Sequence, residues 1–296
     1  MLNKNQGKRK GLIVSISDYA CLQKLDFCKN DGQEMYELLN SLGYEISDNH
    51  KLIGEVNGDK IKDTIYDFFD DDNNSPDDTL LFYYSGHGVP DTDGDTYIAP
   101  SDLDPDKPHR RGFSFDSLTK MTQKSISTRV VTILDCCYSG AAKISKGQED
   151  DAAKLGTIAI KEKLRKLPQG QGRYVLSASQ AAQEAFALTT SDHSIYTYYL
   201  LQGLKGNPES VGSEGNVTPQ SLGAYVYRAI MSLPHNKIPK QIPITKAEES
   251  GNIVLAHYPE LKPVKIDETL ASMLDLLREG KLKNLTRCDS NIQIFL

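Results

Sequence analysis

Long apolar runs and an excess of positive charge are both missing from this sequence. It has no stretch of about 18 apolar residues, the length that a membrane-spanning helix needs, and no apolar segment of a signal peptide follows its charged start. Asp and Glu outnumber Lys and Arg by 40 to 34, which gives a formal net charge of −6. Nucleic acids and anionic membranes bind basic surfaces. We therefore expect a cytoplasmic protein that binds neither of them and whose partners are cationic.

Paired cysteines are missing as well. The five cysteines are an odd number and include no CxxC segment, whereas disulfide frameworks and structural zinc sites use cysteines in sets with characteristic spacings. Neither is expected, and we predict no metal and no other cofactor. A reducing compartment is consistent with cysteines that stay free, one of which is then available for reaction.

What the sequence does contain is an alternation of apolar runs and amphipathic segments. Short runs of β-branched, aliphatic and aromatic residues predict strands at 11–16, 79–84, 130–134 and 173–177, with a weaker one within 44–53. Apolar residues at helical spacing predict helices over 31–42, 58–69, 114–124, 194–204 and 218–233. Such an alternation is typical of a mostly parallel sheet with helices on both faces. We predict an α/β fold, a three-layer α/β/α sandwich.

The length favours one large domain with a short appendage. A chain of 296 residues is near the upper size for a single hydrophobic core, and two prolines follow the last apolar run. We predict a main domain over 1–257 and an accessory C-terminal extension over 258–296. Residues 267–278 of the extension have the spacing of an amphipathic helix, which needs a partner on this chain or a regulatory partner protein. Residues 141–172, rich in Lys, Gln, Gly and Ala, predict a long surface loop.

Two of the predicted strands end in residues suited to nucleophilic catalysis. Cys136 and Cys137 follow the apolar run 130–134, and His87 lies in an SGHG segment that follows another apolar run. The carboxyl ends of parallel strands form the edge at which open α/β sheets bind ligands. A thiol attacks a carbonyl as the thiolate, which a nearby imidazole can generate. A turn histidine or a buried cysteine alone needs no function, but the two motifs together favour a catalytic pair.

These segments resemble the caspase-like cysteine peptidases. YSGHG and ILDCCYSG, with Cys137 lying 50 positions after His87, are similar to the motifs of the metacaspase and prokaryotic caspase branch, and the resemblance extends over about residues 8–257. In the branch with an Asp-x-Cys-x-Ser-Gly pattern, the nucleophile corresponds to Cys137. The resemblance implies the caspase-like fold, His87 as the acid and base, and the backbone amides of Gly88 and Cys137 as donors to the oxyanion.

The neighbouring cysteine and the other histidines are interpreted as structural. Successive strand residues point to opposite faces, so Cys136 and Cys137 cannot both face a cleft, and we interpret Cys136 as a core residue. The remaining histidines lie in no comparable motif. We interpret them as surface or packing residues, and they are His50, His109, His193, His235 and His257.

The resemblance also implies which residues bind the substrate. In the metacaspase branch, the aspartates that correspond to Asp31 and Asp135 line the pocket for the residue before the cleaved bond and select Arg or Lys. Ser177, in the YVLSAS segment, is assigned to the same substrate-binding set. The alternative interpretation of Asp135 is a carboxylate that caps a helix or turn. We expect the partners to be protein substrates with exposed Arg or Lys.

An acidic series after His87 does not make a calcium loop of the EF-hand type. Its sixth position is Thr96, where the sharp turn of such a loop requires glycine. Calcium-activated metacaspases use another carboxylate cluster, and the corresponding positions here include Phe115-Asp116 and a segment after Gly140 with few acids. We therefore expect no calcium dependence.

Together these features predict a cysteine endopeptidase that cleaves after Arg or Lys. The lysine-rich loop 141–172 is the expected site of zymogen processing, and the resemblance allows a role in microbial cell death or antiviral defence. Two alternatives remain open. One is a catalytically silent protein of the same fold that acts as a scaffold, and the other is a peptide ligase that uses the same Cys-His dyad.

Overall fold

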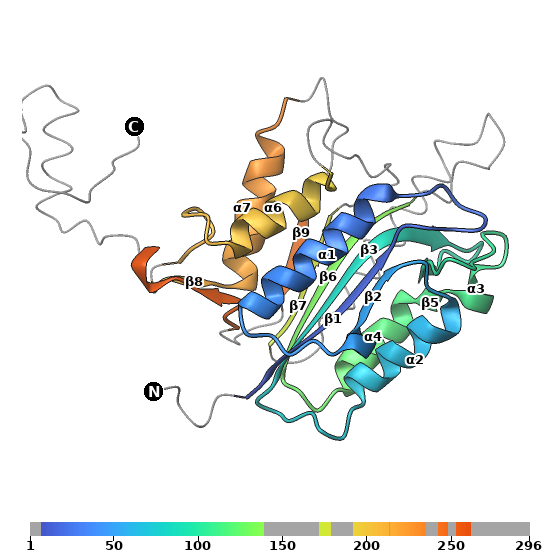
Figure 1. Cartoon of the computed structure of the whole chain (residues 1–296), viewed down its shortest axis with the longest axis horizontal. Helices are drawn as coiled ribbons and strands as arrows, with labels where there is room; N and C mark the ends of the chain where they lie inside the picture. Colours follow the sequence, from blue (N-terminus) through green and yellow to red (C-terminus); the bar gives the residue numbers. More distant parts are fainter. Residues whose placement is uncertain are drawn as a thin grey trace, which may run out of the picture. The chain divides into compact units, whose positions relative to one another are not determined.

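The computed structural model (Figure 1) describes residues 7–138, 172–178, 192–212, 214–234, 242–247 and 253–261, and for Cys137 and Tyr138 it describes the backbone alone. These segments belong to one compact unit that spans residues 1–262. The predicted loop 141–172, apart from its last residue, lies outside the described residues, as do His235 and the predicted helix 267–278.

Most of the strands form one central sheet. The strands are β1 (Arg9–Ile16), β2 (Lys51–Gly54), β3 (Thr79–Pro90), β4 (Thr96–Ile98), β5 (Phe113–Ser114), β6 (Arg129–Tyr138), β7 (Arg173–Ser177), β8 (Asn216–Val217), β9 (Ile244–Ala247) and β10 (Ala256–His257). The central order is β2-β1-β3-β6-β7-β9. Neighbouring strands in this order are parallel, except that β9 runs antiparallel to β7. β4 pairs with the end of β3 and with β5, whereas β8 and β10 pair with each other.

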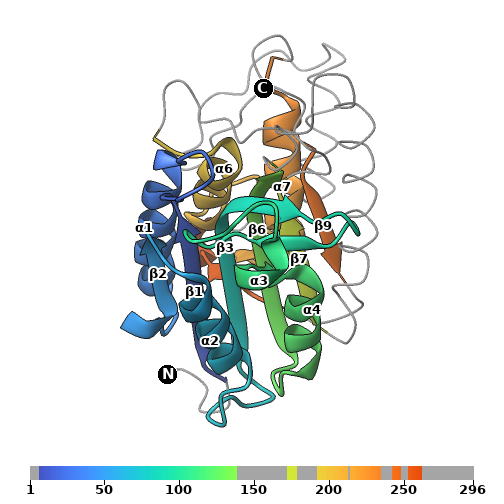
Figure 2. The ribbon, with the colours of Figure 1, turned by 90° about the vertical axis from the view of Figure 1, so that its right-hand side faces the viewer.

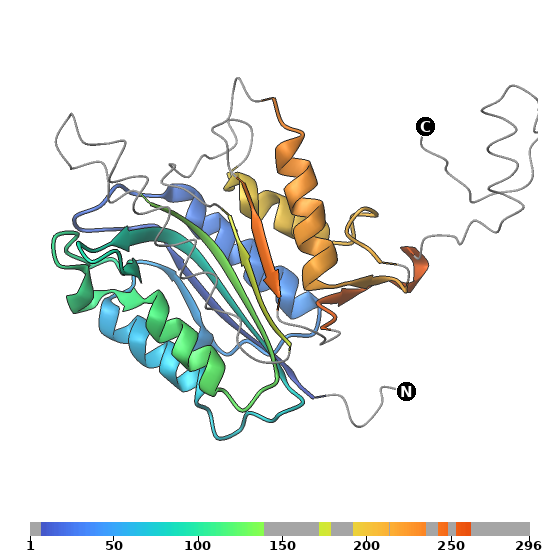
Figure 3. The same cartoon turned by 180° about the vertical axis from the view of Figure 1, so that it is seen from behind.

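Helices cover both faces of this sheet (Figures 2 and 3). They are α1 (Asp26–Ser41), α2 (Gly58–Phe69), α3 (Pro108–Arg111), α4 (Phe115–Lys124), α6 (Ile195–Leu204) and α7 (Pro219–Met231), with 3₁₀ turns at Asp48–His50 and Pro259–Leu261. α2 and α4 lie together on one face, and α1, α6 and α7 lie on the other (Figures 1 and 3). None of the helices within the described segments is both long and apolar enough to cross a membrane.

Alternate residues of the central strands supply two separate cores. On β3, Phe82 packs with α2 and α4, whereas Tyr83 packs with α1, α6 and α7. On β6, Leu134 belongs to the same core as Phe82, and Ile133 belongs to the same core as Tyr83. Both faces of these strands are buried, which is why their sequences are continuously apolar rather than alternating. The predicted three-layer α/β/α sandwich is confirmed.

Several elements extend beyond their predicted ends. β3 continues through the SGHG segment to Pro90, because β4 folds back and pairs with it, and β6 follows in register to Tyr138. α1 begins at Asp26, earlier than the predicted start at residue 31. The sequence did not indicate this first turn because it is largely exposed and has little apolar periodicity. An acidic residue there is favourable at a helix N-terminus. β9 was not predicted, because its four residues alternate between half-buried and exposed.

Candidate active site

β3 and β6 place the predicted catalytic residues side by side at the carboxyl edge of the sheet. Their parallel register pairs His87 with Cys137 and Gly88 with Tyr138. Strands paired in this way lie about 4.8 Å apart. The backbones of His87 and Cys137 are therefore adjacent, although 50 positions separate them in the sequence.

The imidazole of His87 is held in a defined orientation. Its Nε2 lies 2.7 Å from the backbone oxygen of Gln23, and its ring lies 4.6 Å from the ring of Tyr19. A carbonyl oxygen only accepts hydrogen bonds, so Nε2 carries the proton, and Nδ1 is the acceptor in the neutral ring. Burial lowers the pKa of His87 below its usual 6.5, and the bond to Gln23 opposes this change in part. The neutral form, which can act as a base, is thus favoured near neutral pH.

Gly86 makes room for two tyrosine hydroxyls beneath His87. A Cβ at Gly86 would lie 2.6 Å from the hydroxyl oxygen of Tyr84 and 2.7 Å from that of Tyr19, and the φ angle of 155° is one that side chains rarely allow. The Tyr84 hydroxyl donates to the backbone oxygen of His87 at 2.6 Å, and the backbone N–H of His87 donates to the Tyr19 hydroxyl at 3.0 Å. The absence of a side chain at Gly86 therefore permits the hydrogen bonds that support the backbone of His87.

Cys136 is a core residue, as predicted. Its side chain is buried among the residues that β3 and β6 direct toward α2 and α4. Burial raises the pKa of its thiol well above the usual value. A thiol in this setting stays protonated, so Cys136 is a poor nucleophile.

Asp31 and Asp135 bond to the same residue, Ser194, and we call these two aspartates the acidic cluster. Ser194 joins them, because its backbone N–H donates to Asp31 Oδ1 at 3.3 Å and its hydroxyl donates to Asp135 Oδ2. Thr197 also donates to Asp135 Oδ2, at 2.6 Å. Asp31 is 0% exposed and Asp135 4% exposed. The predicted pair is thus brought together, and both carboxylates also secure the N-terminal turn of α6.

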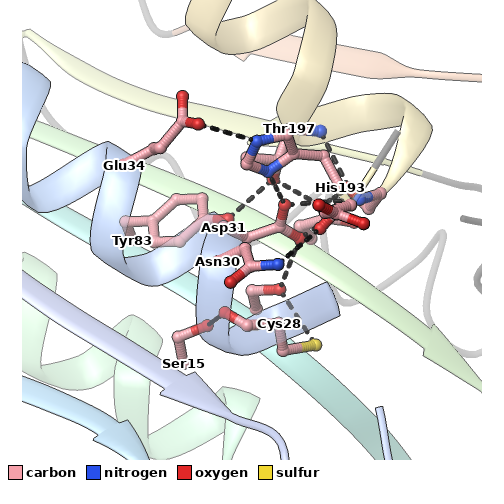
Figure 4. A network of polar contacts seen from close by, with 12 residues as sticks. Ser15, Cys28, Asn30, Asp31, Glu34, Tyr83, His193 and Thr197 are labelled. Atoms are coloured by element: carbon pink, nitrogen blue, oxygen red, sulfur yellow. Dashed lines mark hydrogen bonds and ion pairs between the residues drawn. The ribbon is translucent and has the colours of Figure 1, made fainter. Parts of the chain in front are cut away.

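His193 is part of this arrangement, so its interpretation as a surface or packing residue was wrong. Its Nδ1 lies 2.7 Å from Asp31 Oδ1, and its Nε2 lies 3.0 Å from Glu34 Oε1. Lys205 Nζ lies 3.4 Å from the other oxygen of Glu34. Figure 4 shows Asp31, His193 and Glu34 as a continuous chain of polar contacts between α1 and the segment before α6. Nothing in the local sequence of His193 indicates a contact with a residue 162 positions away.

Ser85 is a second residue that sequence reasoning did not assign to the acidic cluster. It is in register with Asp135 on β6. Its hydroxyl lies 3.4 Å from Asp31 Oδ2 and 3.3 Å from Cys28 Sγ. A signal was present, since Ser85 immediately precedes the glycine and histidine of the SGHG segment.

Burial dominates the electrostatics of the acidic cluster. It raises the pKa of Asp31 to about 7, against the effect of the hydrogen bond from His193, and the charge of Asp135 raises it further. Burial also raises the pKa of Asp135, which the bonds from Ser194 and Thr197 oppose. The bond to Asp31 raises the pKa of His193 above 6.5. Asp31 and His193 therefore both hold their protons to a higher pH than the same side chains do in water.

The remaining predicted site residues lie at the same edge of the sheet. Gly88 is buried between Ile98 of β4 and Tyr138 of β6. Ser177 ends β7 and is buried next to Leu134 of β6. Their contacts with an oxyanion or a substrate stay predictions.

The acidic series after β3 organises its own loop. The Asp91 carboxylate accepts from the backbone N–H groups of Asp93 and Asp95, at 3.0 and 2.7 Å, and from the Tyr97 hydroxyl at 3.0 Å. In the part of the chain that the structure describes, no group of three or more His, Cys, Asp and Glu side chains is arranged to hold a metal ion.

Comparisons with known proteins agree with the resemblance seen in the sequence. A family model described as a caspase domain matches residues 8–250. The crystal structure of caspase-1 from Spodoptera frugiperda is similar to this chain, with a TM-score of 0.55, 12% sequence identity, and coverage of 85% of this chain and 91% of that one. At this identity the similarity shows a shared fold. No curated protein sequence matches.

Proposed function

Because the chain belongs to the caspase-domain family of cysteine peptidases, we propose that it is an active endopeptidase with a Cys137–His87 dyad that cleaves after Arg or Lys. One observation carries the proposal. The register of β3 and β6 sets His87 beside Cys137, and the Gln23 carbonyl fixes the imidazole with Nδ1 as its acceptor. A protein of this fold that served only as a scaffold would have no need for this arrangement.

In the proposed mechanism, His87 accepts the thiol proton of Cys137. The thiolate attacks the carbonyl carbon before the scissile bond, and His87 then donates the proton to the leaving amine. The backbone N–H groups of Gly88 and Cys137 stabilise the negative oxygen of the tetrahedral intermediate. Water attacks the resulting thioester with His87 as the base, which releases the second product and restores the thiol.

The acidic cluster supports selection of a basic residue before the cleaved bond. Two buried carboxylates joined by Ser194 repel each other when both are charged, and a cation between them relieves that repulsion. Arg should be preferred to Lys, because its planar fork can bond both carboxylates at once. An Asp side chain would add a third negative charge to a dehydrated site.

A helix-capping role for Asp135 is a second candidate, and it also has a specific observation in its favour. Oδ2 of Asp135 accepts from the hydroxyls of both Ser194 and Thr197 at the start of α6. Capping and substrate binding can coexist, because a carboxylate has about four acceptor positions. Capping alone predicts that Asp135→Asn lowers stability without changing selectivity.

The test uses fluorogenic peptides that differ only in the residue before the cut, with Arg, Lys, Asp and Ala at that position. Wild type should cleave Arg best, then Lys, and not Asp. Cys137→Ala should be inactive, and His87→Ala should lose about 10²- to 10⁴-fold in rate, as expected when a general acid and base is removed. His257→Ala is the matched control, since His257 is exposed and bonds to Asn216.

Two results would contradict the proposal. Faster turnover of Asp peptides than of Arg peptides would exclude the acidic specificity. A folded wild type that cleaves no peptide would favour the silent scaffold. Mass spectrometry of the products distinguishes the third possibility, because a ligase joins the acyl part to an added amine instead of releasing a free carboxylate.

A further inference from the structure

One of the two carboxylates of the acidic cluster, that of Asp31, is already bonded to a side chain of the protein itself, His193. His193 Nδ1 lies 2.7 Å from Asp31 Oδ1, and Asp31 is 0% exposed. The imidazole has side-chain exposure of 12% and reaches Glu34 with its other nitrogen. Oδ1 of Asp31 also accepts from the backbone N–H of Ser194 at 3.3 Å, so its two acceptor positions are both used, and a guanidinium can bond to Oδ1 only if His193 leaves it.

We propose that His193 determines specificity as an internal competitor: its imidazolium must release Asp31, losing its proton, before a basic substrate side chain can bind there. The inference rests on the proposed function and deepens it, since it concerns the same acidic cluster. Neither the family match nor the sequence motifs assign a role to His193.

The competition follows from the chemistry of the three groups. Asp31 has one oxygen toward His193, and its other oxygen lies near Ser85 and the backbone N–H of Ser194. An imidazolium and a guanidinium are both cations that require the same carboxylate, and together at one buried site they would repel each other. A neutral imidazole forms a weaker bond to a carboxylate than an imidazolium does. Loss of the proton thus lowers the cost of displacing His193.

The charges around His193 favour its protonated form when no substrate is bound. The titratable groups near the imidazole or the acidic cluster include Glu34 and Cys28 on α1, Tyr83 on β3, Tyr196 on α6 and Lys205 directly after α6, besides Asp31 and Asp135 themselves. The carboxylates outnumber the single ammonium, which is paired with Glu34 rather than with His193. A substrate cation beside Asp31 instead disfavours the protonated form of His193, because the two cations repel each other. The affinity for a basic residue should therefore fall as the fraction of competing imidazolium rises.

A purely structural role makes a different prediction. His193 precedes Ser194, the N-cap of α6, and could simply secure that turn. In that case its contacts and its proton would not change when a cation binds to the acidic cluster. The state of the imidazole in the presence of a cation separates the two roles.

The experiment follows the His193 ring by NMR while benzamidine, a small planar cation, is added. Cys137→Ala protein labelled with ¹⁵N in its six histidines is used, so that no turnover or self-cleavage occurs, and His193→Asn identifies the signal. Without benzamidine, His193 should titrate above its usual pKa. With saturating benzamidine its pKa should fall by at least about one unit, which is a tenfold change in proton affinity, and the signal of His257 should not move.

The same data contain an independent check, because linkage is reciprocal. If benzamidine lowers the pKa of His193 by one unit, then the affinity for benzamidine must be about tenfold weaker well below the two pKa values than well above them. Binding of benzamidine with an unchanged pKa of His193 would overturn the inference and leave the proposed specificity intact. If benzamidine does not bind and Arg peptides are not cleaved, the proposed specificity fails and this inference fails with it.

Discussion

Raising the pH from about 5.5 to about 7 should lower the stability that Asp31 and His193 contribute to the fold. Burial raises the pKa of Asp31 from its ordinary 3.8 to about 7, and the bond to Asp31 raises the pKa of His193. The folded protein therefore binds more protons than the unfolded chain in this window. Both groups stabilise the fold at low pH, and both lose this contribution as the pH rises through their folded-state pKa values. Asp31→Asn should remove the dependence.

The expected magnitude follows from the position of the window. One proton corresponds to about 1.4 kcal/mol for each pH unit, so the free energy of unfolding should fall by about 2 kcal/mol between about pH 5.5 and pH 7. Other groups act in the opposite direction. Burial lowers the pKa values of His87 and His50, and such groups add stability as the pH rises toward 6.5. The difference between wild type and Asp31→Asn isolates the contribution of Asp31 and His193.

The assay is urea unfolding at several pH values, in a Cys137→Ala background that prevents self-cleavage. The difference in the free energy of unfolding between Asp31 and Asp31→Asn proteins should change by about 2 kcal/mol across the window, in favour of Asp31→Asn at higher pH. Asp26→Asn is the matched control, because Asp26 is an exposed carboxylate on the same helix. A difference that stays constant, or that changes in favour of Asp31 as the pH rises, would refute the reasoning.

Two further predictions concern the core and the C-terminal residues. Cys136→Ala should keep most of the peptidase activity while the free energy of unfolding falls by about 1–2 kcal/mol, because a buried sulfur leaves a small cavity; a folded but inactive Cys136→Ala would contradict this. Deletion of residues 262–296 should leave peptide hydrolysis measurable, since the described residues form a unit that ends at residue 262. A truncated protein that fails to fold, judged by circular dichroism, would place these residues in the core.

The layers of the fold and the catalytic pair could be predicted because their signals are local. Apolar runs such as 79–84 and 130–134 mark strands buried on both faces, and His87 and Cys137 follow them directly. The parallel pairing of these strands then makes the two residues neighbours. A single strand register accounts for a contact across 50 positions.

The contacts around the catalytic pair could not be predicted, because they depend on packing between distant segments. Gln23 orients His87 through its backbone oxygen, a group that every residue type has. Tyr19 reaches His87 from a loop whose path the sequence does not indicate. His193 meets Asp31 only because α6 packs beside α1 on the same face of the sheet. Pairwise contacts of this kind leave no periodicity or motif.

Ser194 acts as a spacer between the two carboxylates of the acidic cluster. One residue bonds to Asp31 through its backbone and to Asp135 through its side chain, and it is also the N-cap of α6. The separation of the two carboxylates therefore depends on the position of α6, and not only on α1 and β6, which carry Asp31 and Asp135. A guanidinium, with its wide planar fork, depends on that separation more than a compact ammonium does. If the acidic cluster selects basic residues as proposed, then a small displacement of α6 would change the ratio of Arg to Lys cleavage while leaving the catalytic pair untouched.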